Sequence, residues 1–184
     1  MAQIHTLDLR FQDTPGIVAA FLIDSERELA LIETGPASTL PVLIEGIRAL
    51  GFAPELIRRV FVTHVHLDHA GAAGWWARQG ATVHVHPRGA QHLTAPEKLI
   101  DSARRVYGGR FDSLWGEMLP APADRVVALA DGESVKVGRT KITALDTPGH
   151  ARHHNAYVCE GNCFTGDVAG ARLQGSGYIS VTGA

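Results

Sequence analysis

The sequence is poor in cysteine and has no long apolar run. Its two cysteines, Cys159 and Cys163, are separated by three residues, which excludes a two-residue redox spacing and leaves no second pair for a cysteine-based zinc site. No apolar stretch approaches the ~20 residues of a membrane-spanning helix, and the first residues do not combine a basic segment with an apolar run. We therefore expect two reduced thiols, no signal peptide, no membrane association and, by default, a cytoplasmic location.

The sequence also lacks an excess of charge of either sign. The net charge is −2, and solvated helix faces explain the densest basic pairs, Arg58-Arg59 and Arg104-Arg105, better than a nucleic-acid patch does. With 45% hydrophobic and 20% charged residues, the chain can bury a core of its own. We expect a single domain over residues 1–184 and no nucleic-acid partner.

Histidine, by contrast, is abundant, and three of the ten histidines lie in the His-x-His-x-Asp-His segment of residues 64–69. An apolar, β-branched stretch at residues 59–62 predicts a short buried strand just before it. In an extended segment every second side chain points the same way, so His64 and His66 can face one point. Asp68 and His69 follow where the chain begins to turn and can face a second point nearby. The spacing therefore predicts two adjacent metal positions, and these ligand types suit zinc, iron or manganese.

A histidine-rich surface loop and a chance cluster are the alternatives to a metal site. A His-x-His pair alone is weak evidence, because chance pairs are frequent in a chain with ten histidines among 184 residues. The complete pattern behind an apolar strand is far more specific and favours the metal site. A second pair, His84 and His86, is followed by Pro87 and lacks the acid and the third histidine, so we expect these two residues to be structural or to lie at the rim.

Two later segments also end in residues that suit a metal. The Pro-Gly turn of residues 148–149 follows a predicted strand and places His150 at a strand end. Asp167 follows a predicted hairpin at residues 156–165, although a Gly-Asp pair taken alone is most simply a turn. His153 and His154 can line the site or donate hydrogen bonds to it.

The remaining pattern predicts alternating strands and amphipathic helices. The expected strands are residues 4–11, 17–23, 29–32, 81–86, 125–129, 133–137 and 141–145, with turns at 131–132 and 138–139 joining the last three. The expected helices are residues 40–50, with Leu43, Ile44, Ile47 and Leu50 buried, residues 70–78, and residues 89–107, divided at Pro96. The apolar segment 111–120 is either a helix packed on the sheet or a wall over the site.

These segments resemble the signature of the metallo-β-lactamase superfamily, and the resemblance covers most of the chain. It implies an α/β (α+β) fold, a four-layer αββα sandwich of two mixed β-sheets with helices on both outer faces. Many members carry an acid, usually aspartate, beside the metals at the position of Glu33. The resemblance assigns His64, His66 and His150 to a first metal, Asp68 and His69 to a second, and Asp167 to the bridge between them.

The chain departs from the family pattern after Asp167. The family completes the second metal's ligands with a later histidine, and residues 168–184 contain none. The family domain also has further strands and helices, so we expect this domain to lack its C-terminal portion. A missing segment or a self-associated chain would supply the cover. This leaves open a single metal at His64, His66 and His150, and we expect weak occupancy of the second position.

The resemblance implies an enzyme of the glyoxalase II-like branch. Such an enzyme is a hydrolase with one or two zinc ions, or iron or manganese, that uses a metal-activated water on a small-molecule thioester, ester or lactone. Asp68 would be the catalytic residue, orienting the water and managing its proton. Two alternatives stay open. One is a persulfide-dioxygenase-like enzyme with a single iron on His64, His150 and Asp167, and the other is a metal-binding domain without catalysis.

Overall fold

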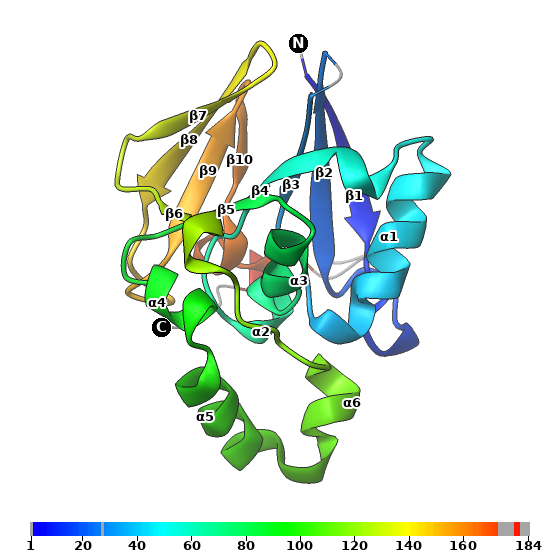
Figure 1. Cartoon of the computed structure of the whole chain (residues 1–184), viewed down its shortest axis with the longest axis vertical. Helices are drawn as coiled ribbons and strands as arrows, with labels where there is room; N and C mark the ends of the chain where they lie inside the picture. Colours follow the sequence, from blue (N-terminus) through cyan, green and yellow to red (C-terminus); the bar gives the residue numbers. More distant parts are fainter. Residues whose placement is uncertain (1, 27, 173–178, 181–184) are drawn as a thin grey trace.

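The computed structural model describes residues 2–26, 28–172 and 179–180 (Figure 1). The strands are β1 (Gln3–Asp8), β2 (Ala19–Ser25), β3 (Glu28–Ile32), β4 (Ile57–Phe61), β5 (Thr82–Val85), β6 (Val126–Ala128), β7 (Ser134–Val137), β8 (Thr140–Asp146), β9 (Asn155–Cys159), β10 (Asn162–Phe164), β11 (Ala171–Arg172) and β12 (Ile179–Ser180). The helices are α1 (Leu40–Ala49), α2 (Leu67–Ala70), α3 (Ala73–Arg78), α4 (Ala90–Thr94), α5 (Glu97–Tyr107) and α6 (Phe111–Trp115). We expected the domain to lack its C-terminal portion. The part of the chain that this expectation concerns includes residues 173–178 and 181–184, which lie outside the described residues.

Strands β1 to β6 form one sheet in sequential order. The first three strands are an antiparallel meander, as predicted for the β2–β3 hairpin, and β3 to β6 run parallel with helices crossing between them. Alternation along β3 buries the sheet on both faces, because Leu29 and Leu31 pack with the helices whereas Ala30 and Ile32 face a second sheet. Figure 1 shows α1 and α3 lying over the helical side of this sheet.

Helix α1 covers part of that side through a narrow apolar stripe. Leu43 and Ile47 are fully buried, as predicted, Ile44 is only partly buried, and the first turn tolerates the proline at position 41. The prediction that Leu50 is buried is wrong, since this side chain is 39% exposed. The helix ends at Ala49, so Leu50 lies past its last turn and is carried away from the sheet.

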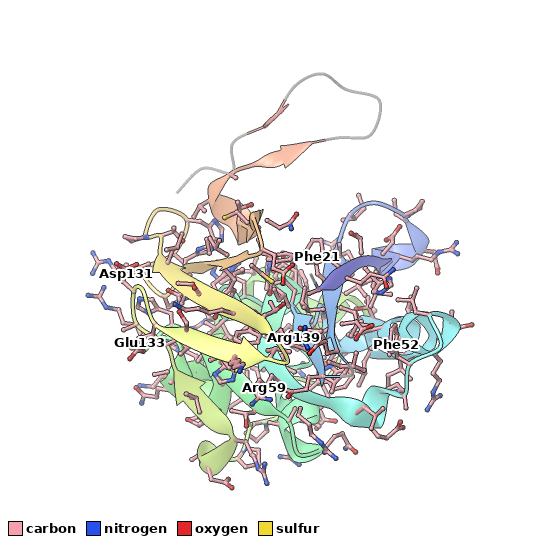
Figure 2. The ribbon with its side chains drawn as sticks, turned by 90° about the horizontal axis from the view of Figure 1, so that it is seen from above. Phe21, Phe52, Arg59, Asp131, Glu133 and Arg139 are labelled. Atoms are coloured by element: carbon pink, nitrogen blue, oxygen red, sulfur yellow. The ribbon has the colours of Figure 1, made fainter. Side chains whose placement is uncertain are left out.

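Strands β7 to β10 form a second, antiparallel sheet in the order β10-β9-β8-β7. A buried cluster joins the two sheets: Ile23, Ala30, Ile32, Phe61, Leu129, Val137, Ile142, Ala144, Tyr157, Cys159 and Phe164. Figure 2 shows Phe21 where the sheets meet, and its ring centroid is 4.9 Å from that of Phe164. The predicted hairpin at 156–165 is β9 and β10, and its two cysteines are free thiols.

The described residues thus form a mixed α/β sandwich of helices, six-stranded sheet and four-stranded sheet. Within the described ranges no helix packs on the outer face of the four-stranded sheet. The outer helical layer that the resemblance implies on that side is therefore not part of the described residues.

Strand β6 belongs to the six-stranded sheet, whereas the turn at residues 131–132 suggested that it pairs with β7 in the other sheet. The segment predicted at 125–129 is β6, which pairs in parallel with β5 and not with β7. The turn at 131–132 therefore carries the chain from one sheet to the other. A parallel partner needs a long crossover, and the helices between β5 and β6 provide it. The pair Arg58-Arg59 likewise lies on β4 and not on a helix, and Arg59 contacts Glu28 at 3.5 Å.

Helices α4, α5 and α6 form that crossover; α4 buries Leu93 in the core, whereas α5 and α6 extend beyond the sandwich (Figure 1). Pro96 separates α4 from α5, as predicted. No residue of α5 is buried, although one face of the helix is apolar, and Val106 is 75% exposed. No helix in the described part of the chain is long and apolar enough to cross a membrane.

Candidate metal centre

The loop after β4 delivers the first four candidate ligands. The chain is extended at His66 and then enters the short helix α2 at Leu67, so the backbone changes direction between the two histidine positions and the Asp-His pair. This change is the one that the sequence predicted. His64 lies between the other two histidines, since its ring centroid is 4.5 Å from that of His66 and 4.2 Å from that of His69.

A first group of metal-binding atoms comes from His64, His66 and His150, whose ligand atoms lie within 4.8 Å of one another. The Nε2 of His150 is 2.9 Å from the Nδ1 of His66. The ring centroids of His64 and His66 are 4.5 Å apart, and those of His64 and His150 are 4.9 Å apart. Residues separated by more than eighty positions in the sequence therefore direct their nitrogens at one point.

A second group shares His64 with the first and comprises His64, His69 and Asp167. Asp68, which the resemblance assigned to the second metal, belongs to neither group among the described residues. The Nε2 of His69 is 3.1 Å from Oδ1 of Asp167 and 3.4 Å from Oδ2 of Asp68. The other carboxylate oxygen of Asp167 is 3.4 Å from Nε2 of His150. Asp167 thus contacts a residue of each group. The alternative trio His64, His150 and Asp167 is not one of the two groups found among the described residues.

The donor atoms fit a divalent metal such as zinc. The Nε2 of His64 is buried and has no hydrogen-bond partner among the described residues, whereas its Nδ1 contacts the Thr63 hydroxyl at 3.0 Å. A buried polar atom without a partner is costly, and metal coordination would satisfy it. A hydrogen bond at the other ring nitrogen is the usual way in which a protein orients a metal-binding imidazole.

The electrostatics separate the histidines into two kinds. Burial lowers the pKa of His64 and of His66, so both rings are neutral at pH 7 and can offer a lone pair. Burial opposes the charged form of His69 as well, but Glu33, Asp167 and Asp68 outweigh it and raise the pKa of His69 well above its ordinary value. The hydrogen bond from His69 holds the pKa of Asp167 below its usual range. Metal binding at the second group must therefore displace a proton from His69.

Glu33 stands at the acid position expected beside the metals. It is 4% exposed, its Oε1 lies 3.3 Å from Nδ1 of His69, and its Oε2 accepts a hydrogen bond from the Thr63 backbone N–H at 3.4 Å. The residue has φ +64°, a left-handed conformation that is uncommon outside glycine. The longer glutamate therefore reaches His69 from behind the site and also holds the start of the ligand loop.

His154 supports the site and His153 lies at its edge. His154 is fully buried, and its Nδ1 contacts the Thr147 hydroxyl at 2.8 Å while its Nε2 accepts the backbone N–H of Asp167 at 3.3 Å. Burial lowers the pKa of His154 to about 4, which keeps Nε2 free to accept. The ring of His153 is 5.7 Å from that of His66. Sequence reasoning left both roles open, because no local signal distinguishes a ligand from its support.

The second His-x-His pair lies outside both groups, as predicted. His84 is on the face of β5 that meets the second sheet, where its ring stacks on Phe61 at 4.6 Å. Burial lowers the pKa of His84 to about 4. The Nε2 of His86 is 3.3 Å from a carboxylate oxygen of Asp146 at the end of β8. These two histidines therefore help to join the sheets.

A cleft of 360 Å³ opens beside the candidate ligands. Its polar side holds His66, Asp68, His150 and Asp167. Its other side comes from α5 and α6, with Trp115 among the lining residues, so the segment predicted as either a packed helix or a wall is both. Asp68 has 37% of its side chain exposed, against 26% for Asp167, the other carboxylate that lines the cleft.

Fold and site together define a two-sheet α/β protein with a candidate two-metal centre at the loops between its sheets. The sequence matches the profile of the metallo-beta-lactamase superfamily over residues 13–182, and the chain belongs to this superfamily.

Three relatives illustrate the range of this family. The metallo-beta-lactamase fold-containing protein ST1585 of Sulfurisphaera tokodaii is 27% identical over 176 residues, which are 94% of this chain and 64% of that protein. Its crystal structure superposes with a TM-score of 0.74, covering 96% of this chain and 67% of that one at 24% identity. A hydroxyacylglutathione hydrolase of Xanthomonas campestris pv. campestris is 28% identical, covering 80% of this chain and 44% of that protein. An atrochrysone carboxyl ACP thioesterase of Aspergillus chevalieri is 31% identical, covering 80% of this chain and 38% of that protein. The chain therefore spans 64%, 44% and 38% of the length of these three relatives.

Proposed function

We propose that the protein is a metal-dependent hydrolase that acts on a thioester, ester or lactone of a small molecule. The observation that carries the proposal is the convergence of His64, His66 and His150 with His69 and Asp167 into two adjacent groups. Two relatives are named for hydrolysis of an acyl group held on glutathione or on an acyl carrier protein, which supports an acyl-transfer chemistry. Zinc is the metal that we expect first, with iron or manganese as alternatives.

Asp68 and Asp167 would have different roles in the reaction. A divalent ion held by these residues would supply a nucleophile at neutral pH, because it would lower the pKa of a water molecule toward ~7. Asp68 lines the cleft next to His69, and we assign it the orientation of that water and the acceptance of its proton. Asp167 contacts His69 and His150 and would hold the two groups at a fixed separation. The substrate carbonyl would approach from the cleft that Asp68 lines.

The test is metal content measured together with turnover. We expect wild-type protein to bind zinc and to cleave members of a panel of thioesters, aryl esters and lactones that includes S-lactoylglutathione. Replacing His66 and Asp167 together by alanine should abolish both metal uptake and turnover. His5→Gln is the matched control, since His5 packs on Phe52 away from the cleft. Turnover that survives the double replacement would refute the proposal.

Asp68→Asn tests the catalytic assignment separately from metal binding. General acid–base groups contribute roughly 10²–10⁴-fold, so we expect kcat to fall by about that factor while the first group retains its metal. If kcat is unchanged, Asp68 is not the proton acceptor.

The same assays decide between this function and its alternatives. Iron in the purified protein together with oxygen consumption on glutathione persulfide would indicate the dioxygenase-like activity. Tightly bound metal without turnover on any substrate class would indicate a metal-binding domain. The free thiols of Cys159 and Cys163 are consistent with a cytoplasmic location, which we include in the proposal.

A further inference from the structure

The cleft beside the candidate ligands has a second, apolar side that the hydrolytic chemistry does not require. Helix α5 contributes Leu99, Ser102, Ala103, Val106 and Tyr107 to it. Each of these positions is three or four residues from another of them, so they form one face of the helix along the cleft.

This face is apolar without being buried. An amphipathic surface helix normally packs its apolar stripe on the core. In α5 no residue is buried, Leu99, Ala103 and Tyr107 pack only partly on the core, and Val106 is 75% exposed. Part of the stripe therefore faces the open cleft, next to the loop that carries His66 and Asp68. Figure 1 shows α5 and α6 extending from the sandwich on the side where α2 lies.

The apolar side is held in place by contacts within the protein. The ring of Trp115 stacks on Phe11 with centroids 5.4 Å apart, and the ring of Tyr107 meets it edge-on at 5.1 Å. Arg104 donates a hydrogen bond to Asp112 at 2.7 Å and so joins α5 to α6. These contacts fix the wall before any ligand binds, which reduces the ordering that binding requires.

The charge of the cleft indicates what it would accept. Among the described residues that line it there is no lysine or arginine, and Asp68 and Asp167 are carboxylates. A carboxylate on the α5 side of the cleft would have no cationic partner among these lining residues. An uncharged apolar group is the ligand that this side of the cleft favours.

We propose that the α5 side of the cleft is an acyl subsite, and that the preferred substrate carries a neutral, unbranched acyl chain of medium length. This inference rests on the proposed hydrolase function. From Leu99 to Val106 the helix face is about 10 Å long at ~1.5 Å per residue, which accommodates a chain of roughly six to eight carbons. In the reaction, water adds its hydroxyl to the carbonyl carbon, the carbon–sulfur bond breaks, and the remaining proton goes to the sulfur. The products are a fatty acid and a thiol.

The test is a chain-length series of uncharged thioesters, the acetyl, butyryl, hexanoyl and octanoyl derivatives of N-acetylcysteamine. A methylene group that becomes half buried should raise kcat/KM about twofold, so octanoyl should exceed acetyl by about 60-fold. The succinyl derivative matches the butyryl chain in length but ends in a carboxylate, and we expect it to be at least about tenfold slower than the butyryl derivative.

Val106→Asp locates the effect on α5. This exposed position tolerates a polar residue, and the variant should reduce the octanoyl-to-acetyl ratio of kcat/KM at least about fivefold. The matched control is Leu56→Asp, an exposed apolar position away from the cleft, which should leave the ratio unchanged. A readout without turnover is the fluorescence change on titration with octanamide, which Trp115→Phe should diminish.

The failures of the two proposals are distinguishable. Equal kcat/KM across the series, or an unchanged ratio in Val106→Asp, would overturn the acyl subsite and leave the hydrolase function intact. No turnover of any thioester, ester or lactone by the metal-loaded protein would overturn the hydrolase function and the subsite with it.

Discussion

Gly166 precedes the candidate bridging residue, and its replacement by alanine is a sharp test of the site. Gly166 has φ +49°, and a Cβ there would lie 2.6 Å from His154 Nε2 and 2.6 Å from the Thr63 hydroxyl oxygen. Both neighbours belong to the supports of the candidate ligands. Thr63 contacts His64, and His154 accepts the Asp167 backbone N–H.

The expected magnitude has two parts. A non-glycine residue in the left-handed region costs about 1 kcal/mol. The two close contacts force the neighbours to move, and such overpacking costs about 1–3 kcal/mol more. We therefore expect Gly166→Ala to lower the free energy of unfolding by about 2–4 kcal/mol, which for a chain of this size corresponds to a Tm lower by roughly 5–15 °C. Because the displaced neighbours orient metal ligands, zinc affinity should fall at least about tenfold.

Gly161→Ala is the matched control. Gly161 lies in the β9–β10 turn with φ +80°, and a Cβ there meets nothing within 4 Å. It carries the backbone cost alone, so we expect a loss of about 1 kcal/mol and unchanged zinc affinity. Urea unfolding and competitive zinc titration against a fluorescent chelator measure both quantities. If the two variants behave alike, the packing of Gly166 against His154 and Thr63 does not hold the site.

Three further predictions concern the surroundings of the ligands. Glu33→Gln removes the carboxylate behind His69 and should weaken the second metal position about 10–100-fold in a zinc titration, whereas the exposed Glu55→Gln should not. The raised pKa of His69 stabilises the metal-free fold fully below pH ~6.5, and this contribution is lost as the pH rises through the raised pKa. His69→Gln should therefore destabilise metal-free protein more at pH 6 than at pH 9, and an equal effect in urea unfolding would contradict this. Tyr157→Phe removes the buried hydrogen bond of 3.0 Å to the Val62 carbonyl and should lower the free energy of unfolding by about 1–2 kcal/mol. The control Tyr107→Phe should leave the free energy of unfolding unchanged.

The candidate site was largely predictable because its signals are local. Alternation in an extended segment is enough to bring His64 and His66 to one point, as the first group shows, but it does not show that His64 also belongs to the group of His69. The place of His150 after a Pro-Gly turn depends equally on nearby residues. The convergence of these segments was expected from the family resemblance, and the structure brings them together. Their role as metal ligands stays a prediction.

The features that sequence reasoning missed depend on contacts between distant segments. The same short apolar strand can pair in either sheet, so the pairing of residues 126–128 with β5 could be known only from the three-dimensional path of the crossover. His154 carries no mark that distinguishes support from ligation, because its partners Thr147 and Asp167 become neighbours only in the fold. Leu50 fits the helical stripe, and only the end of α1 removes it from the core.

The candidate ligands are drawn from both sheets. His64 and His66 follow β4 in the six-stranded sheet, whereas His150 follows β8 and Asp167 follows β10 in the four-stranded sheet. An ion held by all of them would act as a cross-link between the two halves of the sandwich. At a free concentration about a thousandfold above its Kd, the ion would raise the free energy of unfolding by about 4 kcal/mol. Removal of the ion by a chelator should then speed hydrogen exchange of the backbone amides in β3 and β7, the strands that contact each other across the two sheets. This change should be seen under conditions in which the protein has not yet unfolded globally.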